Sequence, residues 1–314
     1  MLNLRWYHYA LWAGFILVMY LLPEFVSRGT LRTMIFANFL AMFAISWDTL
    51  SGRTGYVSFG HPFLIGIGAY TTAILTKRFD VAVELSIPIA VLVTMVGSLI
   101  VLLPALRIRG SYFALVTLAF MELFYQLVQV IRPDLTGGTR GMSGLPTLTR
   151  GAANGYYMSL SLMLALALST WLLMRTRLGT ALSAIGMNED AVEGSGLSVT
   201  KLKLVAFLIS AFIAGLAGAV YIHYLGSIAP RALFDINFVF TIIVAALIGG
   251  AGTTIGPIAG AFFLTFLLEY LRPYLPGAER YMVYCGLALV IYIYQPYGII
   301  ALLNSAFQKM RGRT

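Results

Sequence analysis

The sequence is poor in charged residues and almost free of cysteine. Asp, Glu, Lys and Arg make up 11% of the 314 residues, against about 25% in soluble globular domains. The single cysteine, Cys285, lies in an apolar run and has no second cysteine in the chain for a disulfide. A soluble core cannot absorb an apolar fraction of 60%, so the bilayer must be the solvent for much of the chain.

The sequence motifs of common enzymes are also missing. It contains no G-x-x-x-x-G-K-[ST] phosphate loop, no G-x-S-x-G nucleophile elbow and no Cys or His spacing typical of zinc sites. The three histidines, His8, His61 and His223, lie far apart along the sequence. These absences argue against an enzyme. His61 is expected to form hydrogen bonds in a glycine-rich turn, and a place on a solute path is the second interpretation.

The net charge of +9 would suggest nucleic acid as the partner of a soluble protein. No basic stripe with interleaved aromatic residues occurs here, so a nucleic-acid partner is not expected. Basic residues at the ends of apolar runs are instead typical of topology control and of contact with anionic head groups. Membrane lipid is therefore the expected surrounding.

Long apolar runs predict an all-α fold, a polytopic bundle of transmembrane helices in one domain of residues 1–314. A helix needs about 20 apolar residues to cross about 30 Å of hydrocarbon. Ten runs come near this length: 7–26, 32–50, 56–76, 84–105, 110–131, 155–174, 203–225, 236–250, 256–271 and 281–303. The first lacks a small-residue cleavage pattern and is interpreted as a retained helix. The eighth and ninth are short enough to be broken or re-entrant, so eight to ten spans are predicted.

Basic residues orient this bundle. The polar stretch 175–203 and the C-terminal tail carry Arg175, Arg177, Lys201, Lys203, Lys309, Arg311 and Arg313. The positive-inside rule places both regions in the cytoplasm. With ten spans, the N-terminus then also lies in the cytoplasm.

Two glycine-rich stretches, 51–70 and 247–261, lie in the two halves of the chain. Interrupted hydrophobic segments at related positions are typical of inverted repeats with unwound helix ends beside a solute path. The candidate path residues in these stretches are Gly55, Gly60, His61, Gly250 and Gly252. The alternative is close helix packing, which suits Gly256 and Gly260, four residues apart on one helix face. The two roles are compatible.

One acidic residue, Glu122, lies in the middle of an apolar run. Gln126 and Gln129 follow it at i+4 and i+7, which makes one polar stripe on a helix. A carboxylate at membrane depth costs about 2.5–3.5 kcal/mol, so it should face the bundle interior or water. Two interpretations stay open: a structural hydrogen bond, or a place on the solute path.

The stretch 175–203 is too polar to span a membrane and too patterned for a plain connector. Apolar residues recur there at helical spacing, Glu189, Asp190 and Glu193 form an acidic group, and Gly194 and Gly196 can end a helix. The pattern predicts one or two short amphipathic helices on the cytoplasmic face. Membrane-surface helices usually carry basic polar faces, so the acidic centre favours a protein partner.

Several of these stretches resemble one family of transporters. Residues 176–207 resemble the cytoplasmic coupling loop of ABC importer permeases. Five more stretches resemble LivM-type permeases of branched-chain amino acid ABC importers: TGYVSFGHPFLIGIGAY (54–70), RGSYFALVTLAFMEL (109–123), LTGGTRGMSGLP (135–146), SAFIAGLAGAVY (210–221) and LIGGAGTTIGPIAGA (247–261). Together they cover most of the chain in the family's order. One departure is Gly186-Met187, where relatives often carry an arginine.

The resemblance implies a multi-pass protein of the bacterial cytoplasmic membrane that works by alternating access with several partners. These are a homologous second permease, two cytoplasmic ABC ATPases and an external solute-binding protein. ATP and magnesium would bind the ATPases, so no cofactor is expected in this chain. By family analogy, the segment that docks into an ATPase groove carries Glu189, Asp190, Ala191, Glu193 and Gly196. The loop 135–146 would lie outside, near the binding protein.

The resemblance is less specific for the solute than for the family. Leucine, isoleucine and valine are the family default, while urea, short amides and aromatic acids are carried by similar permeases. Two rival functions need no ATPase: a secondary transporter coupled to H⁺ or Na⁺ through Glu122, and a passive channel. Neither requires an acidic cytoplasmic loop, which favours the ATP-driven importer.

Overall fold

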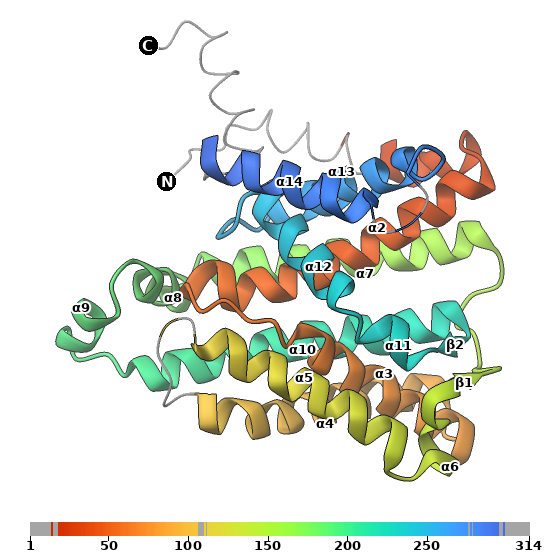
Figure 1. Ribbon diagram of the computed structural model, residues 1–314, viewed down its shortest axis with the longest axis horizontal. Helices are drawn as coiled ribbons and strands as arrows, with labels where there is room; N and C mark the ends of the chain where they lie inside the picture. Colours follow the sequence, from red (N-terminus) through yellow and green to blue (C-terminus); the bar gives the residue numbers. More distant parts are fainter. Residues whose placement is uncertain are drawn as a thin grey trace, which may run out of the picture.

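The computed structural model describes residues 14, 18–105, 110, 112–275, 277, 279–294 and 298, and these residues form a bundle of helices (Figure 1). The predicted all-α fold is confirmed. The long helices are α2 (Arg28–Trp47), α3 (His61–Arg78), α4 (Val83–Ala105), α5 (Tyr112–Val130), α7 (Ala152–Met174), α10 (Val199–Leu225), α12 (Ile236–Gly249), α13 (Gly256–Leu271) and α14 (Glu279–Tyr294).

Short elements connect the long helices. They are the 3₁₀-helices η1 (Leu22–Glu24) and η3 (Gly138–Arg140), the π-helix η2 (Asp48–Gly52), and the α-helices α6 (Pro133–Thr136), α8 (Arg177–Met187), α9 (Glu189–Gly194) and α11 (Pro230–Leu233). The strands β1 (Met142–Ser143) and β2 (Ser227–Ile228) form one antiparallel pair with Met142 opposite Ile228. This pair joins two connecting loops and leaves the helical architecture unchanged.

Among the described residues, six helical stretches are long and apolar enough to cross a bilayer: 28–52, 83–100, 112–130, 152–174, 199–225 and 230–249. This confirms a multi-pass membrane protein. The other helices that match predicted runs, α3, α13 and α14, fall short of that length or hydropathy. The predicted run 7–26 lies mostly outside the described residues. The single domain of residues 1–314 and the inverted repeat stay predictions.

The first glycine-rich stretch interrupts a predicted span. Residues 55–60 are not helical, and α3 begins at His61 rather than at residue 56. Gly55 has a φ of +76°, which a residue with a side chain rarely adopts. Pro62 follows in the first turn of α3, where its missing N–H costs no helical hydrogen bond. The chain therefore enters α3 from an extended segment.

The core lies where α2, α3, α10 and α12 pack together. In the most apolar 18-residue window of each span, 89% of α2 and 67% of α10 are buried, against 22% of α5. Glycines allow α3 and α10 to approach closely, because a Cβ added at Gly68 would lie 2.4 Å from the Gly215 carbonyl oxygen. The buried helices thus form a centre, and α4, α5 and α7 surround it.

The connecting elements gather at two opposite ends of the bundle (Figure 1). Helices α8 and α9 lie at one end, whereas α6, β1, β2 and α11 lie at the other. The acidic stretch 175–203 and the glycine-rich loop 135–146 are therefore separated by the length of the bundle.

Candidate functional site

The polar stretch 175–203 contains two short helices, as predicted. Helix α8 ends at Met187, and Asn188 caps α9 by accepting a hydrogen bond from the Ala191 N–H at 3.0 Å. Ile185, Val192 and Val199 form a small buried cluster beneath them. The α8–α9 segment (175–203) is therefore a folded unit that packs its apolar side chains against the bundle.

The acidic group of α9 divides into an inward and an outward part. The Lys203 Nζ lies 2.7 Å from the Glu189 Oε1, and the Tyr56 hydroxyl donates a hydrogen bond to the Glu189 Oε2. Asp190 and Glu193 are exposed at the surface. Of the three predicted docking carboxylates, Glu189 thus holds α9 to the bundle, and the other two face outward.

Lys203 completes this polar contact from the first turns of α10. Its ammonium donates to the Tyr56 hydroxyl oxygen at 2.6 Å and lies 3.9 Å from the centroid of the Tyr56 ring. The side chain is buried, with Lys203 only 8% exposed. Lys203 was predicted only as a charge that orients the bundle, and Tyr56 was not predicted as a site residue. The available signal was an acidic residue and a lysine around one loop, which does not identify a tyrosine more than 130 residues away.

The remaining predicted docking residues, Ala191 and Gly196, are exposed like Asp190 and Glu193. Met187, at the C-terminal end of α8, is 89% exposed. The outer surface of α9 therefore carries two acidic side chains, and the large apolar side chains of Met187 and Leu197 are exposed beside it.

Gly186 has a structural reason to lack a side chain. A Cβ at this position would lie 2.5 Å from the Arg53 carbonyl oxygen, closer than real Cβ contacts come. The end of α8 thus lies directly against the backbone at residues 53–54. This contact accounts for the glycine in Gly186-Met187.

The two glycine-rich stretches meet in the structure. Asp48, which is 3% exposed, accepts a hydrogen bond from the Gly252 N–H at 2.6 Å. A Cβ at Gly52 would lie 2.0 Å from the Asp48 Oδ1 and 2.8 Å from the Gly252 nitrogen. Arg53 approaches the same place, with 3.8 Å between its Nε and the Asp48 Oδ2. Asp48 was not predicted as a site residue, although a charge at the end of an apolar run beside glycines was a signal.

The glycines proposed for the solute path have local backbone roles. Gly250 and Gly252 have φ values of +119° and +79° in the turn between α12 and α13. A Cβ at Gly60 would lie 2.7 Å from the Thr117 carbonyl oxygen. Gly260 serves the predicted packing, because a Cβ there would lie 1.9 Å from the Ala245 carbonyl oxygen.

His61 is buried, with 1% exposure, and takes part in a polar cluster between α2, α3 and α10. Its Nε2 lies 3.0 Å from the Ser210 Oγ. Ser46 and Ser210 exchange hydrogen bonds between their hydroxyls and carbonyls, at 2.8 and 2.9 Å. His61 thus has the hydrogen bond that its first interpretation expects, but it lies in the first turn of α3 and not in the glycine-rich turn before it.

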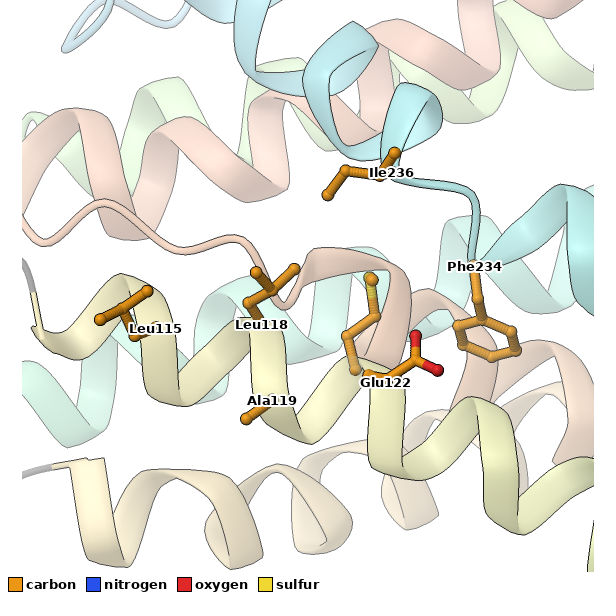
Figure 2. A pocket seen from close by; sticks show the side chains of 7 residues that line it. Leu115, Leu118, Ala119, Glu122, Phe234 and Ile236 are labelled. Atoms are coloured by element: carbon orange, nitrogen blue, oxygen red, sulfur yellow. The ribbon is translucent and has the colours of Figure 1, made fainter.

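An open cavity of about 580 Å³ lies between α5 and the connection from α11 to α12 (Figure 2). Its lining is apolar apart from one carboxylate: Leu115, Leu118, Ala119, Met121, Glu122, Phe234 and Ile236. The Gln126 Nε2 donates to the Glu122 Oε1 at 2.8 Å. Gln129 instead donates to the Tyr125 carbonyl of its own helix at 3.4 Å. The structure therefore joins two members of the predicted polar stripe at the cavity.

The described residues contain no group of three His, Cys, Asp or Glu side chains that could hold a metal ion. The candidate functional sites among these residues are therefore the α8–α9 segment, the Asp48–Gly252 contact and the cavity at Glu122. None of them combines a nucleophile with a general base.

Comparison with known proteins gives a consistent result. Residues 29–293 match a family described as the permease component of the branched-chain amino acid transport system. The chain is 27% identical to the high-affinity branched-chain amino acid transport system permease protein LivM of Salmonella typhimurium, over 93% of this chain and 74% of the relative. LivM of Escherichia coli is 27% identical over 92% of this chain and 74% of its own length. The ribose import permease protein RbsC of Haemophilus influenzae is 26% identical over 68% of both chains. No solved structure matches the chain.

Proposed function

The chain belongs to the permease family of branched-chain amino acid transport systems and is the transmembrane component of an ABC importer, not an enzyme, and from this premise we propose that it carries leucine, isoleucine or valine. The coverage of 93% by LivM, against 68% by the ribose permease, supports an amino acid over a sugar. Family membership also argues against the two rival functions, because neither an ion-coupled transporter nor a passive channel uses ATP.

The observation that carries the choice of solute is the cavity at Glu122. An amino acid has an ammonium group, which a carboxylate binds by a charge-assisted hydrogen bond, whereas a sugar has no such charge. Leu115, Leu118 and Phe234 offer apolar contact to a branched aliphatic side chain (Figure 2). We therefore assign Glu122 and Gln126 to the solute path. No role on the path is assigned to His61, Gly55, Gly60, Gly250 or Gly252.

Transport would require the partners that the family resemblance implies. These are a second, homologous permease, two ABC ATPases and an external binding protein, with ATP and magnesium held by the ATPases. The α8–α9 segment would lie in the cytoplasm and the loop 135–146 outside, which agrees with their places at opposite ends of the bundle (Figure 1). The positive-inside rule supports the same orientation in a bacterial cytoplasmic membrane, with both termini inside.

The ATPase contact would be the outward surface of the α8–α9 segment. Val192 is buried and fixes the orientation of α9, so Asp190, Ala191 and Glu193 face away from the bundle. Gly196 follows α9 at a φ of +85°. Met187 supplies an apolar tip that can enter a groove on the ATPase. ATP-driven closure would then move this segment and switch the access of the bundle from one side to the other.

Uptake by the reconstituted complex tests the solute. The full complex, with its binding protein, is placed in vesicles with ATP, and radiolabelled leucine is followed. We expect ATP-dependent uptake that unlabelled valine and isoleucine compete with and ribose does not. Competition by ribose alone, or equal uptake without ATP, would contradict the proposal.

Charge reversal tests the ATPase contact. Asp190→Lys combined with Glu193→Lys should abolish copurification of the ATPases, because the acidic surface becomes basic, while insertion into the membrane is retained. The matched control is Glu84→Lys with Asp134→Lys, which reverses two exposed acids at the other end of the bundle. Normal copurification with the first pair would defeat the assigned contact.

A further inference from the structure

We propose that residues 53–56 are a positioning link, which transmits movement of the α8–α9 segment to the turn between α12 and α13. This rests on the proposed contact between that segment and the ATPases. Residues 53–56 join the end of η2 to the extended approach to α3, so they lie between the two regions. They contact the α8–α9 segment with Tyr56 and the α12–α13 turn with Arg53.

Tyr56 attaches the link to α9 and α10. Its hydroxyl donates to the Glu189 carboxylate and accepts from the Lys203 ammonium at 2.6 Å, so one oxygen contacts both members of an ion pair. The Tyr56 ring also packs edge-on against Phe113, with 5.5 Å between the centroids. Hydrogen bonds to charged groups away from water are strong and directional. A displacement of Glu189 with α9 therefore acts on Tyr56.

A backbone contact reinforces the attachment. Gly186 at the end of α8 lies against the carbonyl of Arg53, at a distance that leaves no room for a Cβ. Gly55 lies against Gly186 in turn, since a Cβ on Gly55 would be 3.5 Å from the Gly186 Cα. Close-packed backbone cannot absorb a movement by side-chain rotation, so α8 and residues 53–55 must shift together.

Arg53 connects residues 53–56 to the turn between α12 and α13. Its Nη2 donates to the Thr254 Oγ1 at 3.4 Å, and its Nε lies 3.8 Å from the Asp48 Oδ2. The same Asp48 carboxylate holds the Gly252 N–H at 2.6 Å. Gly250 and Gly252 lack a Cβ and can adopt φ of either sign, so the turn they form can change its backbone conformation at low cost. Movement of Arg53 thus reaches a turn that is able to respond.

Contact between these groups establishes a continuous route, but only a measured coupling identifies a link. The readout is leucine imported per ATP hydrolysed by the full complex in vesicles. Tyr56→Phe removes the hydroxyl and keeps the ring. We expect this ratio to fall by about tenfold or more, because the lost hydroxyl makes hydrogen bonds to two charged groups, with the ATPases still copurifying. Tyr270→Phe, on a ring that is 68% exposed, is the matched control and should leave the ratio unchanged.

A double-mutant cycle tests whether the two ends act together. Thr254→Val removes the hydroxyl that Arg53 contacts. If the link is one unit, the ratio of leucine imported to ATP hydrolysed in the double variant Tyr56→Phe/Thr254→Val should equal that of the single variant with the lower ratio. Two multiplying effects would mean independent contacts and would overturn the link.

Exchanging the charges of Glu189 and Lys203 distinguishes an effect of the link on coupling from a general loss of stability. Glu189→Lys and Lys203→Glu should each lower the ratio, and the combined exchange should recover most of it because the opposite charges face each other again. Failure of the exchange to improve on either single variant would count against the link.

Different results would contradict the proposed link and the proposed ATPase contact. Loss of copurification on Tyr56→Phe would place Tyr56 in the docking surface and overturn the link. Normal copurification with the reversed Asp190 and Glu193, beside a low ratio for Tyr56→Phe, would reject the docking surface and leave the effect of Tyr56 on coupling in place.

Discussion

The span 28–52, formed by α2 and η2, and the span of α5 are both apolar and each carry one acidic residue, yet the protein uses them differently. In their most apolar windows, 89% of α2 is buried and 22% of α5. Asp48, at the end of α2, is enclosed and holds the backbone of Gly252, whereas Glu122 in α5 is exposed at an open cavity. Burial of an intramembrane carboxylate with fixed partners indicates a structural role. Exposure beside an apolar cavity indicates a role toward a solute or a partner.

Removal of the buried carboxylate should have the largest effect on stability. Asp48→Ala leaves the Gly252 N–H without its acceptor and Arg53 without its counter-charge. Breaking a buried pair typically costs about 3–5 kcal/mol, so we expect a large loss of folded protein. Thermal unfolding in detergent, followed by size-exclusion chromatography, measures it.

Asp48→Asn is the matched variant for that experiment. The asparagine side chain keeps an oxygen that can accept from the Gly252 N–H, while the charge opposite Arg53 is lost. It should be more stable than Asp48→Ala. Equal stability of the two would show that the hydrogen bond to Gly252 contributes little.

A disruption of the packing of α12 on α13 should have the second-largest effect on stability. Gly260→Ala places a methyl group 1.9 Å from the Ala245 carbonyl oxygen, and backbone atoms cannot rotate away. Overpacking of this kind costs about 1–3 kcal/mol. The thermal midpoint should fall accordingly. Gly286→Ala in α14, where nothing lies within 4 Å of the added Cβ, is the control and should be neutral or stabilising. If the thermal midpoint of Gly260→Ala equalled that of the wild-type protein, α12 and α13 would be able to separate easily.

Hydrophobic run length predicted the helices well, because a bilayer imposes one requirement on every span. The structure has a helix within each predicted run from 32–50 to 281–303. The error at residues 56–60 came from counting Tyr56, Val57 and Phe59 as parts of a span. Tyr56 and Phe59 instead pack against Phe113 and Phe240 from an extended segment, and Val57 is exposed. Run length alone cannot distinguish such a segment from a span.

The site was less predictable because its contacts join distant parts of the sequence. The acidic pattern identified α9, but the direction of each carboxylate depends on which helix face packs inward. Val192 determines that face, and Lys203 and Tyr56 then select Glu189. The meeting of Asp48 with Gly252, 204 residues apart, follows from tertiary packing that no local pattern contains.

At the exposed carboxylate we expect an effect on transport with little effect on stability. Glu122→Gln removes the charge that would bind a solute ammonium group but keeps an oxygen for the Gln126 amide. Leucine uptake by the complex should fall about tenfold, as for the loss of one charged hydrogen bond, with the thermal midpoint unchanged. A lower midpoint with normal uptake would make Glu122 a structural residue like Asp48, and the contrast between α2 and α5 would disappear.

The smallest effect is expected at Glu269, an exposed acid near the end of α13. Its Oε1 lies 3.5 Å from the Arg272 Nη1, and both side chains are more than half exposed. An exposed ion pair contributes about 0–1 kcal/mol, so Glu269→Gln should move the thermal midpoint little and leave uptake unchanged. This variant removes the same charge as Glu122→Gln from α13, at a residue that does not line the Glu122 cavity. If it reduced leucine uptake as strongly, net charge rather than the cavity would explain the result at Glu122, and exposure alone would no longer distinguish a solute-binding carboxylate from a surface one.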